Sequence, residues 1–254
     1  MYTCKDRFCP FCNWRRARKL AIQSYKLLSE IQKKENIRYI FLTLTVKNPR
    51  LEDTRSIISH MNKSFKRMTE SIRFKNSIAG HCKILEVHPQ YKKNSFSHPH
   101  FHVVLAVRSS YFDNLYIKQD EWKEMWKRAL KADYEPSVDV RIIKSNDEND
   151  PIAKVVSECF KYPMKSTSLN SMSWQEFEVF TKQLKGLRFL SFGGILKDYR
   201  EILKLEDVED GDLIYEDEKN ELIWKKIASL VYEFKSGEYG LDYYIIKYLE
   251  APQV

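Results

Sequence analysis

The stretch His98-Pro99-His100-Phe101-His102, followed by the apolar run Val103-Val104-Leu105-Ala106-Val107, is the most informative part of this chain. The apolar run predicts a buried strand, because short continuous apolar runs are typical of strands inside a sheet. Side chains alternate between the two faces of a strand, so the three histidines are expected on one face. Imidazoles at this spacing can reach one metal ion. The alternative is a polar strand face whose histidines bond to neighbouring residues.

The segments around this strand predict an α+β fold. Strands are expected over residues 38–46, 80–88, 98–108 and 137–143, with helices over 51–73 and 118–132. The order β-α-β-β-α-β matches the ferredoxin-like (split βαβ) arrangement, a mainly antiparallel sheet with helices on one face.

Further helices are expected on both sides of this core. A basic amphipathic helix is expected over 14–34 and another helix from Pro151 to about residue 161. Residues 173–205, with a break at Gly193-Gly194, and residues 221–235 are also expected to be helical. We therefore divide the chain into a cysteine-containing basic segment and helix (1–35), a sheet core (36–170) and a mostly helical C-terminal region with an acidic tail (171–254).

The charge of the chain is unevenly distributed. Residues 206–254 contain 13 Asp/Glu and 5 Lys/Arg, a net charge of −8, whereas residues 1–205 carry a net charge of +16. A basic body predicts a polyanionic partner, most commonly nucleic acid. Ordinary solubilising charge is the alternative interpretation.

No apolar run in the sequence approaches the ~20 residues of a membrane span. The first residues also lack the apolar core of a signal peptide. We therefore expect a cytoplasmic protein with no membrane partner.

Three of the five cysteines, Cys4, Cys9 and Cys12, lie close together near the N-terminus. An odd number of cysteines without an export signal argues against a disulfide framework. The three thiols resemble part of a structural zinc site, which needs four ligands. The candidates for the fourth ligand are His81, Cys82 and a residue ahead of this sequence. Reduced cysteines without a metal are the alternative.

A third ligand for the histidine site is expected from the preceding strand. Hairpin pairing would bring the carboxylate of Glu86 close to His100 and His102, and His88 is the rival because it has the same strand parity. Two imidazoles and one carboxylate leave coordination positions open. Such a site suits a divalent ion that acts on a phosphate.

Glu158 and Tyr162 are the candidate catalytic pair. Residues four apart share a helix face, and Pro163 restricts Tyr162 and is expected to end or kink the helix. A phenol with a pKa near ~10 needs activation before it can act as a nucleophile. Since the chain has 15 tyrosines, a packing role for Tyr162 is the alternative.

In this order, the motifs resemble those of plasmid rolling-circle replication initiators (Rep proteins) of the HUH endonuclease superfamily. The closest resemblance is to the group with a single catalytic tyrosine and a glutamate four residues before it. The resemblance extends from residue 4 to about residue 200. The matching segments are Cys4–Cys12 with Trp14-Arg15-Arg16, Phe41–Thr45, His98–His102, Glu158–Tyr162 and Gly193-Gly194.

The resemblance implies metal-dependent nicking and joining of single-stranded DNA at a plasmid origin, where a hairpin presents the nick site. His100, His102 and Glu86 would hold Mg²⁺ or Mn²⁺. Tyr162 would form a 5′-phosphotyrosine and release a 3′-OH, and Glu158 would activate water for the terminating cleavage.

The resemblance also suggests partners for the chain. Host helicase and polymerase are the expected protein partners. Candidate DNA contacts are Arg15, Arg16, Lys161 and Lys165. Solvated helix side chains are the alternative for the two lysines.

Two other functions fit parts of the pattern. One is a related HUH enzyme, such as a transposase or a relaxase. However, relaxases usually place the tyrosine near the N-terminus, and HUH transposases are usually shorter and lack a glutamate at this spacing. The other is a non-catalytic DNA-binding protein whose histidines and cysteines bind structural zinc.

Overall fold

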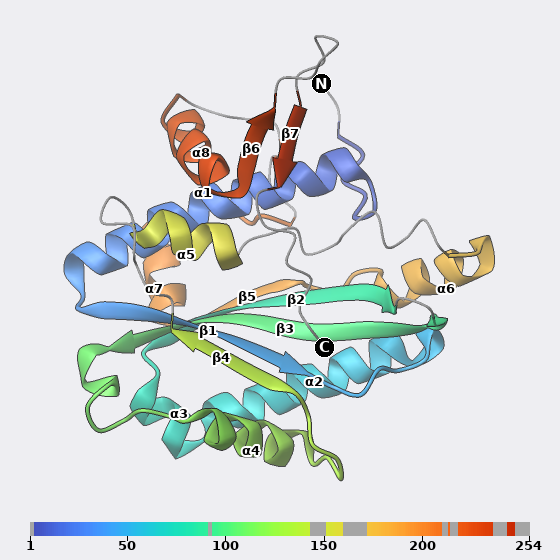
Figure 1. Ribbon diagram of the computed structural model, residues 1–254, viewed down its shortest axis with the longest axis horizontal. Coiled ribbons are helices and arrows are strands. Elements are labelled where there is room, and N and C mark those ends of the chain that lie inside the picture. The colour runs from blue at the N-terminus through green and yellow to red at the C-terminus, as the bar shows by residue number, and fades with distance from the viewer. Residues whose placement is uncertain are drawn as a thin grey trace.

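The computed structural model describes residues 3–90, 93–142, 151–159, 172–209, 213, 218–235 and 243–246. Within these ranges, a five-stranded sheet with the order β4-β1-β3-β2-β5 forms the centre of the molecule (Figure 1). All neighbouring strands are antiparallel. The strands are β1 (Ile37–Thr45), β2 (Gly80–Gln90), β3 (Lys93–Arg108), β4 (Val138–Ile142) and β5 (Leu190–Gly194).

The first four strands have the ferredoxin-like order, which confirms the predicted fold class. β3 is the central strand, between β1 and β2, and helices on the two sides of the sheet cover its apolar residues. Residues 103–107 are completely buried. This explains why the run after the histidines is continuously apolar rather than alternating.

One face of the sheet carries the helices of the ferredoxin-like core, as expected. The helix α2 buries a stripe at helical spacing, including Ile58, Met61 and Phe65, against Phe101 and Leu105 of β3. The helices and 3₁₀ turns of this side are η1 (Leu51–Asp53), α2 (Thr54–Glu70), α3 (Ile72–Ser77), η2 (Ser109–Tyr111), α4 (Gln119–Leu130) and α6 (Trp174–Leu184).

Helices outside the ferredoxin-like core cover the opposite face (Figure 1). The alternate residues of β3, Val104 and Ala106, contact them together with Cys82 and Ile84 of β2. These helices are α1 (Pro10–Lys34), α5 (Pro151–Cys159), α7 (Ile195–Ile202) and α8 (Glu218–Val231). The sheet is therefore enclosed on both sides by helices from distant parts of the sequence.

Two segments that we expected to be helical are strands. Leu190–Gly194 forms β5 and pairs with residues 80–84 of β2, and Tyr232–Lys235 forms β6, which pairs with β7 (Tyr243–Ile246). Without β5, the outer edge of β2 would expose unpaired backbone groups, and β5 satisfies them with ladder hydrogen bonds. The expected C-terminal helices α6, α7 and α8 are present on either side of these strands.

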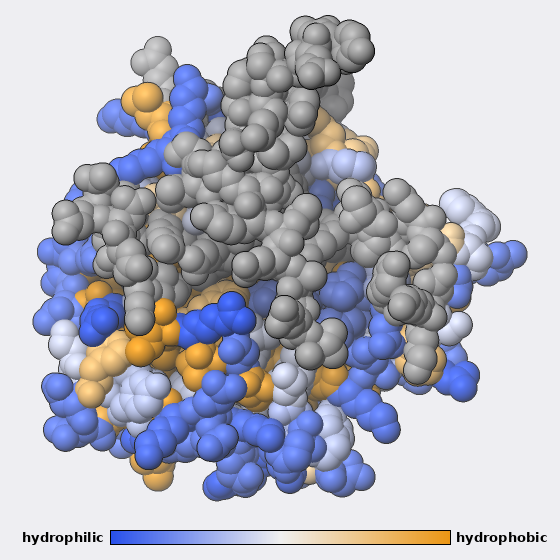
Figure 2. Space-filling view, viewed as in Figure 1, coloured by the Kyte–Doolittle hydropathy of each residue, from blue (hydrophilic) through white to orange (hydrophobic). Residues whose placement is uncertain are grey.

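No helix in the described part of the chain combines the length and the apolar character needed to cross a bilayer. The large exposed apolar side chains belong to several different elements. On the face shown in Figure 2, hydrophilic residues dominate the region over α3 and α4.

Candidate metal centre

The register of three central strands brings the predicted ligands together. Glu86 of β2 pairs directly with His100 of β3, and Thr43 of β1 pairs directly with His102. Because side chains alternate along β3, His100 and His102 project from the same face. The apolar residue between them, Phe101, is buried on the other face against α2.

The three ligand atoms of this triad lie within hydrogen-bonding distance of one another. His102 Nε2 is 2.9 Å from Glu86 Oε2 and 3.0 Å from His100 Nε2, and His100 Nε2 is 3.3 Å from the same oxygen. One proton shared between two of these atoms makes one hydrogen bond, but the lone pair of the third atom then faces another lone pair. One cation at the centre would satisfy all three atoms.

The charge of Glu86 suits it to hold a cation. Burial raises the pKa of its carboxyl, but hydrogen bonds to His100 and His102 outweigh this effect and hold the pKa well below its usual range. Glu86 is therefore an anion at neutral pH. The side chain of His102 is 24% exposed, so the triad opens to solvent on the His102 side.

Thr43 orients His102 from the neighbouring strand. Its Oγ1 lies 3.3 Å from His102 Nδ1, and the ring of Phe41 stacks on the imidazole at 5.1 Å. A hydrogen bond from Nδ1–H to this hydroxyl leaves the Nε2 lone pair for a metal, as is usual for metal-ligating histidines. Sequence inspection missed this role of Thr43, although strand parity places it on the same face.

The donor set fits the predicted Mg²⁺ or Mn²⁺. Carboxylate oxygen suits both ions, and two imidazoles favour Mn²⁺ over the harder Mg²⁺. Three protein ligands on one side leave positions for water and substrate oxygens. Glu86, His100 and His102 could thus hold one divalent ion and leave coordination positions open.

The helix that carries Glu158, α5, lies on the same side of the sheet as the triad. α5 packs through Ile152, Val155 and Val156 onto the face of β3 that carries the triad. Glu158 lies in the last turn of this helix, and its side chain is not among the described ones. Tyr162 lies outside the described residues, as do Lys161 and Lys165.

The three N-terminal cysteines converge on one point. Their sulfur atoms lie within 4.8 Å of one another, and Cys4 and Cys12 are 3.5 Å apart. A hydrogen bond from the backbone of Cys12 lowers the pKa of Cys9, whereas burial raises the pKa of Cys12. The arrangement provides three of the four thiolate or imidazole ligands of a structural zinc site.

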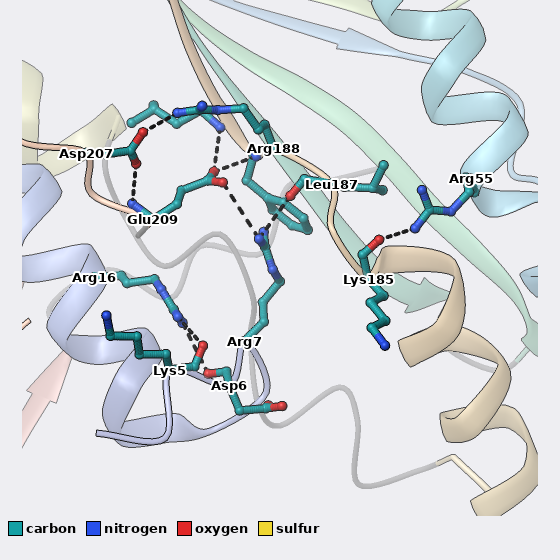
Figure 3. Close-up of polar contacts among 12 residues, drawn as sticks. Lys5, Asp6, Arg7, Arg16, Arg55, Lys185, Leu187, Arg188, Asp207 and Glu209 are labelled. Carbon is teal, nitrogen blue, oxygen red and sulfur yellow. Dashed lines mark hydrogen bonds and ion pairs between the residues drawn. The ribbon is translucent and has the colours of Figure 1, made fainter. Parts of the chain in front are cut away.

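Two arginines fix the cysteine loop in place (Figure 3). Arg7 donates to the carbonyl of Leu187 at 3.0 Å, lies 3.8 Å from the carboxylate of Glu209 and stacks over Phe189. Arg16 donates to the backbone carbonyls of Lys5 and Asp6. The loop is thus attached to the segment around β5, 180 residues later in the sequence.

The expected fourth zinc ligands, His81 and Cys82, do not join this cluster. Cys82 is buried in β2 among apolar residues, which raises the pKa of its thiol above the usual range. His81 packs edge-on between Phe65 and Phe74 on the opposite face of the sheet, and burial lowers its pKa to about 4. In the described residues, no further Cys, His, Asp or Glu belongs to the cluster.

The two arginines predicted to bind DNA also make contacts within the protein. Arg16 bonds to the cysteine loop, and Arg15 donates to the carbonyl of Leu213 at 3.4 Å and lies near the rings of Phe11 and Trp14. Their role in DNA binding stays a prediction.

The chain is similar to known proteins over most of its length. Residues 1–244 match the profile of a family described as Replication protein. The "Protein rep" of Streptococcus pneumoniae is 36% identical over 225 residues, which cover 87% of this chain and 69% of the relative. The "Protein rep" of Bacillus amyloliquefaciens is 34% identical over 268 residues, covering 96% and 76%. A "Replication protein" of Staphylococcus aureus is 36% identical over 212 residues, covering 79% and 88%.

No solved structure matches the chain with significance. The family profile nevertheless spans almost the whole sequence, and the relatives share about a third of their residues with it over most of their length. The chain therefore belongs to the replication protein (Rep) family.

Proposed function

We propose that this protein initiates plasmid rolling-circle replication by nicking and rejoining one DNA strand at the plasmid origin, as an HUH endonuclease. The observation that carries the proposal is the convergence of Glu86, His100 and His102 within 3.3 Å in a replication protein. A divalent ion bound there would supply positive charge next to the scissile phosphate.

The nucleophile in this proposal is the phenol oxygen of Tyr162. It attacks the scissile phosphorus, the bond from phosphorus to the 3′ oxygen breaks, and the 5′ end becomes a phosphotyrosine. The released 3′-OH primes synthesis by host polymerase, with a host helicase opening the duplex. The phenol proton passes to a base or to solvent before or during attack.

Glu158 is proposed to end the reaction. A carboxylate four residues before the tyrosine can act as a general base on water. Water would then make the second cleavage, so that the round ends without a second tyrosine adduct. The packing of α5 on the histidine face supports this assignment, because it places the helix that carries Glu158 on the required side of the sheet.

The basic body of the chain supports DNA as the substrate. A cleft of about 630 Å³ beside β5 has one acidic lining residue, Glu201, and five basic ones. The basic residues are Lys83, Arg188, Lys197, Arg200 and Lys204. We propose that this cleft binds the phosphate backbone of the DNA. We also expect the protein to act in the cytoplasm.

The experiment that tests the proposal uses an origin oligonucleotide labelled at its 3′ end and Mn²⁺. The wild-type protein should retain the label through a denaturing gel as a covalent adduct, and Tyr162→Phe should lose the adduct. Tyr199→Phe is the matched control, since Tyr199 lies on α7 with its hydroxyl near Glu35. An undiminished adduct with Tyr162→Phe would remove this tyrosine from the mechanism. If the wild-type protein also formed no adduct, the result would favour a non-catalytic DNA-binding protein.

A further inference from the structure

A second group of histidines lies beside the metal triad on the same face of the sheet. His88 of β2 pairs directly with His98 of β3, two residue pairs along the ladder from Glu86–His100 and therefore on the same face. Each of His88, His98 and His100 offers a ring nitrogen within 4.8 Å of the other two. The ring centroids are 4.9–5.8 Å apart.

Two of these rings are oriented by hydrogen bonds at Nδ1. His98 Nδ1 lies 2.7 Å from Asn48 Oδ1, and His88 Nδ1 lies 3.1 Å from the carbonyl oxygen of Pro89. A carbonyl oxygen accepts hydrogen bonds but cannot donate them, so the proton sits on Nδ1 in both rings. The lone pair that can ligate a metal is therefore on Nε2 in each case. This is the orientation that outer-shell oxygens impose on metal-ligating histidines.

His100, the third member of this group, has a buried ring nitrogen that is not satisfied. Its residue is 7% exposed, and its Nδ1 is buried with no hydrogen-bond partner among the described residues. Its Nε2 faces Glu86 and His102 in the triad. A buried ring nitrogen without a partner is costly, and native proteins usually satisfy such an atom with a hydrogen bond, a water or an ion.

We propose that His88, His98 and His100 form a second metal site, which takes a borderline transition ion such as Zn²⁺ through three imidazole nitrogens. Imidazole-rich sites favour Zn²⁺, Cu²⁺ and Ni²⁺ over Mg²⁺. The site differs in this respect from the triad, whose carboxylate suits Mg²⁺ or Mn²⁺. His100 connects the two sites, with Nε2 in the triad and Nδ1 in the second site.

Sharing His100 has a defined chemical consequence. If each ring nitrogen of His100 held an ion, the ring would lose its remaining proton and become an imidazolate, so Zn²⁺ binding at the second site would release one proton to solvent. Its stronger negative charge would make it a better donor to the ion in the triad. The second site rests on geometry alone, so it stands or falls independently of the proposed nicking reaction.

The test counts bound metal in the full-length protein after removal of metals with a chelator. The wild type should bind one more Zn²⁺ per chain than His88→Gln or His98→Gln in equilibrium dialysis. Both variants should keep their Mn²⁺ affinity at the triad within about threefold, whereas His102→Gln should lose Mn²⁺ and keep the extra Zn²⁺. The matched control is His60→Gln, because His60 bonds to the carbonyl of Leu130 on α4, at the other face of the sheet.

Equal Zn²⁺ counts in wild type, His88→Gln and His98→Gln would overturn the proposal. A parallel loss of one and the same ion in His88→Gln, His98→Gln and His102→Gln would also overturn it, since it would show a single extended site. NMR of ¹⁵N-labelled histidine rings in the wild type needs no variant. Zn²⁺ should shift Nε2 of His88 and His98 together with Nδ1 of His100, and unmoved signals of these three atoms would refute the site.

Discussion

Glu86 and His100 face each other as a direct pair across β2 and β3, with Glu86 Oε2 and His100 Nε2 3.3 Å apart. His102 lies two residues after His100 on β3, on the same face of the strand, and contacts both residues. The three ligands thus come from the central strand β3 and its neighbour β2, where backbone ladders fix their positions. Sites built on strands hold ligand geometry better than sites on loops.

Removing the hydroxyl of Thr43 should weaken metal binding without removing a ligand. In Thr43→Val, His102 Nδ1 loses its partner, and we expect Mn²⁺ affinity to fall by about 10–100-fold. Thr45→Val is the control, because Thr45 bonds instead to the carbonyl of Ser137. Titration followed by electron paramagnetic resonance measures both variants. Equal Mn²⁺ affinities for the two would show that Thr43 does not position the ligand.

Replacing Glu158 should separate the first cleavage from the last. Glu158→Ala is expected to nick the origin at a rate close to that of wild type, because Tyr162 carries that step. It should then fail to release after one round, since no carboxylate activates water. Covalent protein–DNA complexes should accumulate over several rounds, as measured on denaturing gels. Clean release by Glu158→Ala would contradict the role given to this carboxylate.

A side chain at Gly194 should weaken the attachment of β5 to β2. Gly194 has φ 58° and ψ −148°, and an added Cβ would lie 2.3 Å from the carbonyl oxygen of Ala79. We expect Gly194→Ala to lower the free energy of unfolding by more than about 2 kcal/mol. Gly186 also has a positive φ but open space around it, so Gly186→Ala should cost about 1 kcal/mol. Denaturant unfolding compares the two, and equal losses would mean that the contact with Ala79 contributes nothing.

The buried amine of Lys83 should make stability depend on pH. Burial lowers its pKa to about 8, and the amine lies 4.3 Å from the ring of Phe101. Below pH 8 the folded protein must bury a charged amine, whereas the unfolded chain keeps its amine charged up to its ordinary pKa of 10.5. Stability should therefore rise, not fall, as the pH increases from 8 to 10.5.

The contribution of Lys83 can be isolated by comparison with Lys83→Met. The difference in free energy of unfolding between the two proteins should change by roughly 2–4 kcal/mol from pH 7 to pH 10.5, in favour of the wild type at high pH. Urea unfolding at several pH values measures this difference. A difference that does not vary with pH would mean that Lys83 keeps its ordinary pKa in the folded protein.

Strand parity explains why the metal triad could be predicted from the sequence. The period of two placed His100 and His102 on one face, and the short connection between β2 and β3 predicted hairpin pairing with Glu86. The same parity also relates His88 to His98. From the sequence, His88 is only a rival to Glu86 as a triad ligand, whereas the register places it in a separate group of histidines.

Features that depend on distant contacts could not be predicted in this way. Leu190–Gly194 is short, and it is a strand because the edge of β2, about 110 residues earlier, binds it. The positions of His81 and Cys82 relative to the N-terminal cysteines depend on two things: the face of β2 that each residue occupies, and the place where α1 packs on the sheet. The spacing of these residues in the sequence does not predict where α1 packs. The division into parts at residues 35/36 and 170/171 stays a prediction.

The central claim is tested most directly with supercoiled plasmid carrying the origin, incubated with the protein with and without Mn²⁺. We predict relaxed circles with protein attached at a 5′ end, formed with Mn²⁺ and lost in the double variant His100→Ala, His102→Ala. Relaxation that persists undiminished in this variant, or that proceeds equally well after metal removal, would contradict the assignment of the triad as the catalytic metal site.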